Sequence, residues 1–144
     1  MSPNQVTYVE AHGTGTQAGD PLEVASVRSV FGSSTRNEEL HIGSIKGNIV
    51  HCETAAGAAG LLKVISMLEY QAIPPQASHK TWNPKIPALS PDRMAIAKEL
   101  RTRDTPIRAA IVNSYSAAGS NASALCCEGP KTPQGGAASK PGLN

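Results

Sequence analysis

Two histidines in this sequence stand in settings that could do chemistry. His12 lies in residues 10–16 (EAHGTGT), and His51 lies in residues 46–53 (KGNIVHCE). Each follows a predicted strand and precedes a predicted helix, and such junctions in α/β folds present side chains and backbone donors to ligands. The two imidazoles therefore predict one shared site that handles a carbonyl or carboxylate group.

The first histidine is positioned by a strand, a loop and a helix. Residues 6–9 are β-branched or aromatic and predict a strand, which the loop 12–19 follows. Asp20 and Pro21 predict the start of a helix, because they combine a capping side chain with proline at the first helical position. Gly32 predicts the end of that helix.

The second histidine is positioned by a predicted strand at 40–45, a loop at 46–53 and a helix from about residue 54 to residue 71. The first half of this helix, 55–60 (AAGAAG), has almost no side chains, and glycine costs about 1 kcal/mol per residue in a helix relative to alanine. A sequence tolerates that cost where another backbone approaches closely. The second half, 61–68, carries an apolar stripe, so we expect a deeply buried helix.

The chain divides into a predicted lobe, residues 1–129, and a predicted linker or tail, residues 130–144. The tail is rich in Gly, Ala, Ser, Pro and Lys and has too few apolar groups to fold. The later elements of the lobe are predicted as an irregular segment (78–92), a strand (94–97), a turn (102–106) and a hairpin whose strands (107–114, 122–127) flank a tight turn (117–121).

Composition indicates one α/β domain and excludes several classes of protein. The chain has 144 residues, 40% of them apolar and 3% aromatic, so its core is predicted to be aliphatic. Its net charge is +2 and no basic run alternates with aromatic residues, so no nucleic acid partner is expected. The N-terminus does not resemble a signal peptide, and the longest apolar stretch, 55–68, is too short and interrupted to span a bilayer. Three cysteines, two of them adjacent, argue against a disulfide framework and favour a reducing, cytoplasmic location.

Two binding alternatives receive weaker support from the sequence. No metal site is expected, because no pair among His12, His41, His51 and Cys52 has the spacing of zinc ligands. Residues 13–19 lie between a strand and a helix as a dinucleotide-binding loop does, but their spacing differs from the standard fingerprint and no Tyr-x-x-x-Lys follows.

Four blocks together carry a resemblance to a known family. They are residues 10–16 with 19–21, residues 43–46 with 48–49 and 51, residues 55–61, and residues 113–121 (NSYSAAGSN). In these blocks the chain resembles the C-terminal half of a β-ketoacyl synthase (ketosynthase), the condensing domain of polyketide and fatty acid synthases. The last block is most similar to fungal iterative polyketide synthases.

The resemblance implies a thiolase-like α/β fold, of which this chain is the C-terminal lobe, with a mixed sheet and a buried Ala/Gly-rich helix. It also implies an acyltransferase activity, the decarboxylative Claisen condensation of acyl and malonyl thioesters. No cofactor is expected to bind directly, since the phosphopantetheine arm of an acyl carrier protein carries the substrate. The tail is then similar to a linker toward an acyltransferase region.

The resemblance also implies roles for single residues. His12, His51 and Lys46 match the family's catalytic His/His/Lys group, in which two imidazole N–H groups can stabilise an enolate and need a defined tautomer. Lys46 could orient one histidine or pair with Glu53. The remaining matches are Thr14 and Thr16 to positions that contact pantetheine, Tyr115 to an aromatic residue bordering the acyl pocket, and Glu53 and Asn121 to structural supports.

Two departures from the family limit what this chain does alone. The family's nucleophilic cysteine belongs to the other half, and none of Cys52, Cys126 and Cys127 replaces it, so we expect the isolated chain to be inactive. Val50 stands where the family usually has glycine. A β-branched residue is unfavourable there if that backbone needs a positive φ, and it would crowd the cavity if the glycine serves only for clearance.

The missing half implies partners. We expect an exposed apolar face and, with it, self-association or contact with an N-terminal ketosynthase half, in addition to the acyl carrier protein. The alternative hypothesis is a non-catalytic ketosynthase fragment that acts only as a structural or interaction module.

Overall fold

A computed structural model describes residues 1–102 and 109–129 of the chain. The predicted tail, 130–144, and most of the predicted turn at 102–106 lie outside the described residues. The helices are α1 (Gly19–Phe31), α2 (Lys46–Ile49) and α3 (Ala56–Tyr70), and the strands are β1 (Tyr8–Glu10), β2 (Leu40–Gly43), β3 (Ala72–Ile73), β4 (Met94–Ala95), β5 (Arg101–Thr102), β6 (Ala109–Tyr115) and β7 (Asn121–Cys127).

Five of these strands form one mixed sheet in the order β4-β2-β1-β6-β7. β1 runs parallel to both β2 and β6, and β4 runs parallel to β2. β7 returns antiparallel to β6 after a tight turn in which Gly119 has a φ of +91°. The predicted α/β class with a mixed sheet is confirmed, as is the predicted hairpin.

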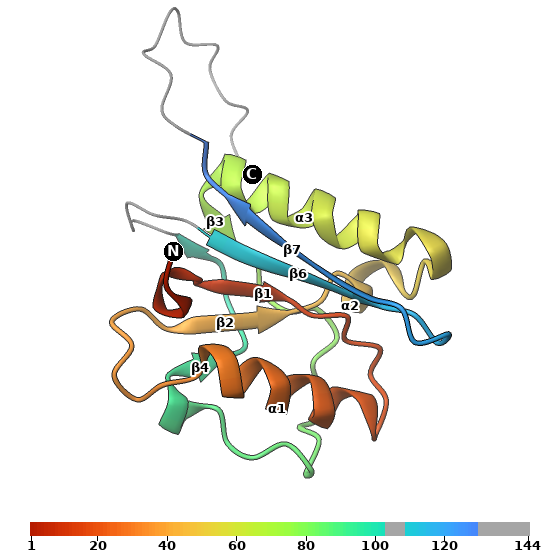
Figure 1. Cartoon of the computed structure of the whole chain (residues 1–144), viewed down its shortest axis with the longest axis horizontal. Helices are drawn as coiled ribbons and strands as arrows, with labels where there is room; N and C mark the ends of the chain where they lie inside the picture. The colour runs from red at the N-terminus through yellow and green to blue at the C-terminus, as the bar shows by residue number, and fades with distance from the viewer. Residues whose placement is uncertain (103–108, 130–144) are drawn as a thin grey trace, which may run out of the picture.

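The sheet separates two helical layers, with α3 on one side and α1 on the other (Figure 1). Successive residues of a strand point to opposite faces, and β1 follows this rule. Val9 packs in the same apolar cluster as Val27 of α1, whereas Tyr8 packs in the cluster that contains Val64 of α3. Glu10 points to the same side as Tyr8 and is only 1% exposed. An acidic residue is therefore buried in the layer between β1 and α3.

The start of α1 differs from the prediction. The helix begins at Gly19, whose backbone N–H donates to the hydroxyl of Thr16 at 2.9 Å. Asp20 does not cap the helix, because its carboxylate instead accepts the N–H of Gly15 at 3.1 Å. The predicted cap is therefore wrong, and Thr16 satisfies one of the free N–H groups at the helix start.

Short elements that the sequence did not predict complete the fold. α2 forms a single helical turn inside the segment predicted as a loop, and a 3-10 turn (Glu53–Ala55) leads into α3. β3 and β5 pair antiparallel as a two-stranded sheet. Each of these two strands has only two residues, which is too few for a pattern of alternating polarity.

The glycines of α3 make room for side chains of the sheet. A Cβ atom on Gly60 would lie 3.1 Å from Cγ of Glu10, and one on Gly57 would lie 3.0 Å from Oγ of Ser114. A close approach to the first half of α3 is therefore confirmed, but side chains of the sheet approach it and not another backbone.

The opposite face of α3 is not covered in this chain. Leu61, Leu62 and Ile65 are 37%, 64% and 48% exposed, so the expected burial of the whole helix is wrong for the isolated chain. Within residues 1–102 and 109–129, no helix has the length and apolar character needed to cross a membrane.

Candidate functional site

His12 is held at the end of β1 by two sets of contacts. Its backbone N–H and that of Gly13 donate to the two carboxylate oxygens of Glu23, at 2.8 and 2.9 Å. Its ring nitrogen Nδ1 accepts the backbone N–H of Tyr115 at 3.3 Å. The loop and the ring are therefore fixed independently, one by α1 and the other by β6.

His51 is held within its own loop. Its Nδ1 accepts the backbone N–H of Glu53 at 3.0 Å. Val50, directly before it, has a φ of 62° and a ψ of −172°. That combination belongs to a backbone region that is essentially reserved for glycine. One interpretation of the valine in place of glycine is that this backbone needs a positive φ. The structure has that positive φ at Val50.

The two imidazoles lie side by side. Their ring centroids are 5.6 Å apart and the rings meet edge to face at an interplanar angle of 80°. Because Nδ1 of each ring accepts a backbone N–H, the proton of each neutral ring sits on Nε2. The site thus offers two Nε2–H donors from two neighbouring loops.

Burial, with the charge of Lys46, favours a neutral His12. Burial and then the charge of Lys46 lower the pKa of His12, and they outweigh the opposing effect of Glu23. Burial also lowers the pKa of Lys46, against the raising effects of Glu10 and Glu23. A neutral imidazole beside a cationic ammonium suits a site that must stabilise negative charge without giving up a proton.

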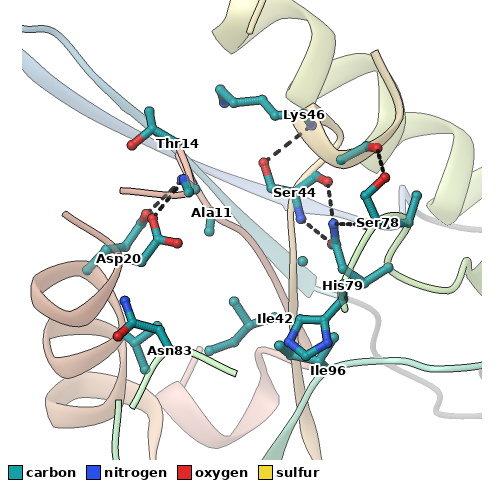
Figure 2. A pocket seen from close by; sticks show the side chains of 18 of the residues that line it. Ala11, Thr14, Asp20, Ile42, Ser44, Lys46, Ser78, His79, Asn83 and Ile96 are labelled. Atoms are coloured by element: carbon teal, nitrogen blue, oxygen red, sulfur yellow. Dashed lines mark hydrogen bonds between the residues drawn. The ribbon is translucent and has the colours of Figure 1, made fainter. Parts of the chain in front are cut away.

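A cavity of about 620 Å³ opens beside the histidines. His51, Lys46 and Thr14 line it, whereas His12 does not, although its neighbours Ala11 and Gly13 do. Figure 2 shows Lys46 and Thr14 at one end of the pocket and residues of the irregular segment and β-sheet towards the other. The lining of the cavity also includes apolar side chains, namely Ile42, Ile86, Leu89 and Ile96.

The other predicted site residues take different places. The Tyr115 ring lies 5.4 Å from the His12 ring, and burial raises the pKa of its hydroxyl. Asn121 begins β7, directly opposite Tyr115 in the register. Lys46 and Glu53, both described, form no ion pair with each other, so that predicted pairing is wrong. Glu53 contacts the site through its backbone.

Glu23 supports the site, a role that was not predicted from the sequence. Besides the two backbone N–H groups, it accepts the side-chain amide of Asn113 at 3.3 Å, and Asn113 in turn accepts the hydroxyl of Ser123 at 2.8 Å. A signal was present, because Glu23 lies four residues before the buried Val27 and therefore on the inner face of the helix. Among the described residues, no cluster of three or more His, Cys, Asp or Glu side chains could hold a metal ion.

Comparisons with known proteins agree with one another. The family model described as "Beta-ketoacyl synthase, C-terminal domain" matches residues 1–80. A non-reducing polyketide synthase of Preussia isomera is 64% identical over 130 residues, which are 90% of this chain and 6% of that protein. One of Stereocaulon alpinum is 62% identical over 130 residues, 90% of this chain and 5% of that protein.

Solved structures give the same result. The ketosynthase from module 6 of the bacillaene synthase of Bacillus subtilis 168 superposes with a TM-score of 0.82 at 33% identity. The match covers 90% of this chain and 24% of the ketosynthase. The chain therefore spans about a quarter of that ketosynthase structure and about 6% of the Preussia isomera synthase.

Proposed function

Because this chain belongs to the family of β-ketoacyl synthase C-terminal domains found in polyketide synthases, we propose that it supplies the hydrogen-bonding half of a ketosynthase site. The reaction is the decarboxylative condensation of an acyl thioester with a malonyl thioester. His12 and His51 donate to the malonyl thioester oxygen, and Lys46 stands beside them as a fixed positive charge.

The close pairing of the two imidazole rings, each with its proton on Nε2, carries this proposal. Loss of CO2 from a malonyl thioester leaves the electron pair of the broken carbon–carbon bond on an enolate, with negative charge on the thioester oxygen. Two N–H donors that are already oriented stabilise such an oxygen, by about 2.7–4 kcal/mol per well-placed donor. The backbone contacts at Nδ1 of both rings supply that orientation in advance.

The carbon–carbon bond then forms at a thioester held elsewhere. The enolate carbon attacks the acyl carbonyl carbon on a cysteine of the N-terminal lobe, and the cysteine leaves as a thiolate. Cys52 is not that cysteine in this proposal, because it lies next to His51 in the chain and its thiol points to the carbonyl oxygens of Ile49 and Val50. The other two cysteines lie on β7.

The proposed partners follow from this division of the site. An N-terminal ketosynthase lobe would supply the nucleophile and cover the exposed apolar face of α3. An acyl carrier protein would deliver its phosphopantetheine arm past Thr14, which lines the cavity. No cofactor is proposed, and a cytoplasmic location belongs to the same proposal.

A second candidate is a non-catalytic lobe that acts through its surface alone. Two observations favour it: the strained backbone at Val50, beside a proposed catalytic residue, and the apolar face of α3. The two candidates differ in whether substitution of the histidines changes any measured activity.

The test compares this chain alone with the chain supplied with the N-terminal ketosynthase lobe of the Preussia isomera relative. Each sample receives acyl- and malonyl-loaded carrier protein, and intact mass spectrometry follows acyl-enzyme and ketide product. We expect no product from the chain alone and product from the two lobes together.

In the complemented sample, His12→Ala and His51→Ala should each lower the rate of product formation about 100-fold or more, the usual effect of removing one such donor. His41→Ala serves as the control, because His41 belongs to β2 and pairs with Glu39 away from the site. Product from the chain alone, or full activity in the His12 variant, would refute the proposal.

A further inference from the structure

Three titratable side chains that the proposed chemistry does not use are buried together between β1 and α3. Lys63 of α3 donates its Nζ to Oε2 of Glu10 at 2.8 Å and to the hydroxyl of Tyr8 at 2.6 Å. The Tyr8 hydroxyl donates to the same Glu10 oxygen at 2.9 Å. The side chains of Glu10 and Lys63 are 2% and 10% exposed, so this ion pair is shielded from water.

Glycines clear the space that this cluster needs. A Cβ atom on Gly60 would press on Glu10 at 3.1 Å, and one on Gly43 would lie 2.6 Å from the hydroxyl of Tyr8. Both glycines are therefore sterically matched to the buried polar cluster rather than to an apolar core.

The second oxygen of Glu10 faces the candidate site. Oε1 accepts the backbone N–H of Ile45 at 2.6 Å, and Ile45 is the residue directly before Lys46. The segment from Ile45 to His51 contains only the single helical turn of α2. One turn of helix is not stable by itself in water, so this segment needs anchors from outside.

We propose that Glu10 is a positioning residue. Lys63 holds one oxygen of its carboxylate in place, and the other oxygen fixes the start of the segment that carries Lys46 and His51. The consequence for catalysis rests on the proposed ketosynthase function. The positioning itself is a property of the chain and can be measured without turnover.

The charged character of the pair supports positioning over simple stabilisation. Replacing a buried ion pair by apolar groups of similar shape is often neutral or even stabilising, so an ion pair is a poor device for stability alone. A carboxylate offers two acceptor oxygens in a fixed plane, and here each oxygen serves a different element. A glutamine offers only one, so Glu10→Gln cannot accept from both α3 and Ile45.

The contacts of His12 provide an internal reference. That loop is held by Glu23 and Tyr115, and in the described part of the chain neither of them forms a hydrogen bond or ion pair with Glu10 or Lys63. If Glu10 positions only the second loop, its loss should disturb Lys46 and leave the tautomer of His12 unchanged. A purely global effect on stability would disturb both loops.

The experiment uses the 144-residue chain and two variants, Glu10→Gln and the double variant Glu10→Met/Lys63→Met, which leaves no acceptor for Ile45 and no buried unpaired charge. Amide hydrogen exchange reports on the N–H of Ile45, and mass spectrometry reports the rate at which Lys46 is acetylated by a water-soluble reagent. We expect Ile45 to exchange at least tenfold faster and Lys46 to react several-fold faster in both variants.

Two controls separate positioning from lost stability. Glu99→Gln removes a surface carboxylate, and Leu40→Ala weakens the apolar cluster on the other face of the sheet. Neither should change the ratio of Lys46 to Lys85 acetylation. Unchanged Ile45 exchange in the folded double variant, or an equal change in Leu40→Ala, would overturn the proposal. If the two-lobe sample forms no ketide while these readouts hold, only the proposed function fails.

Discussion

The backbone N–H of Tyr115 lies 3.3 Å from Nδ1 of His12 and so leaves the proton of that imidazole on Nε2. Two residues that are 103 positions apart in the chain meet here because β1 and β6 are parallel neighbours. The tautomer of a proposed catalytic group is thus set by sheet topology.

The protonation of His12 should depend on Lys46. Burial and the Lys46 charge lower the pKa of His12 from its ordinary value of 6.5. Removing the ammonium in Lys46→Met should move that pKa back toward 6.5, as an NMR titration of the ring would detect. An unchanged or lower midpoint in the variant would contradict the assigned cause.

The same shift has a consequence for stability. Since the folded pKa lies below the unfolded one, the unfolded chain binds this proton first as the pH falls. The contribution of neutral His12 is complete above about pH 6.5 and is lost as the pH falls through the folded pKa.

Val50→Gly should stabilise the chain. A non-glycine residue in this backbone region carries about 1–3 kcal/mol of strain, whereas the added flexibility of glycine in the unfolded chain costs about 0.4–1 kcal/mol. Val50 is 77% exposed, so little burial is lost. Urea unfolding should show a net gain of about 1 kcal/mol, the middle of a range from about 0 to about 2.6 kcal/mol.

The matched control is Gln71→Gly. Gln71 has a φ of 57° and a ψ of 37°, a left-handed conformation that non-glycine residues adopt more readily. Its substitution should change the free energy of unfolding less than Val50→Gly does. A loss of stability in Val50→Gly would show that the valine side chain makes contacts that outweigh the strain.

Glu23→Gln should loosen the first histidine loop. The glutamine amide presents N–H₂ to a backbone N–H where the carboxylate presented an oxygen, so one donor loses its acceptor. We expect a loss of about 1–3 kcal/mol in the free energy of unfolding. Asp20→Asn, which affects a single exposed contact to Gly15, should cost less. Equal effects of the two variants would argue against the role of Glu23 in holding the His12 loop.

Arg36→Lys should destabilise the fold strongly for a conservative change. The Arg36 guanidinium is buried, and burial lowers its pKa. A lysine cannot reach the same acceptors, and each lost charged hydrogen bond costs about 1.5–3 kcal/mol. The acceptors are the backbone oxygens of Pro3, Asn4, Val6, Phe31 and Glu38.

Arg101→Lys is the control for that substitution. Arg101 is 52% exposed in its side chain, and within residues 1–102 and 109–129 its ion pair is with the exposed Glu99. Its replacement should stay within about 0.5 kcal/mol of the parent in urea unfolding. If the two arginine variants unfold alike, the backbone contacts of Arg36 contribute nothing measurable.

The elements that carry the histidines could be predicted from the sequence because their signals are local. β-branched or alternating residues predict β1, β2 and the hairpin of β6 and β7. An Ala/Gly run with an apolar stripe predicts α3. The family resemblance was confirmed by the comparisons. These features need only neighbouring residues to be recognised.

The supports of the site could not be predicted in the same way. The contacts by which Glu23 holds the His12 loop and Glu10 holds Ile45 join residues 10 to 35 positions apart, and only the folded chain brings them together. Their sequence signal is the presence of a charged residue on an apolar face, which periodicity alone counts as a mismatch. The strands β3 and β5 could not be predicted for a related reason, because their pairing depends on which segments lie close together in the fold and not on a residue pattern.

The central claim is that His12 and His51 lie together and that each carries its proton on Nε2. Its most direct test is a long-range ¹H–¹⁵N spectrum of the histidine side chains at pH 8. It reports, for each ring, which nitrogen carries the proton. The account predicts that His12 and His51 are both protonated on Nε2, with a nuclear Overhauser contact between the two rings. A proton on Nδ1 of either ring, or two rings without contact, would contradict it.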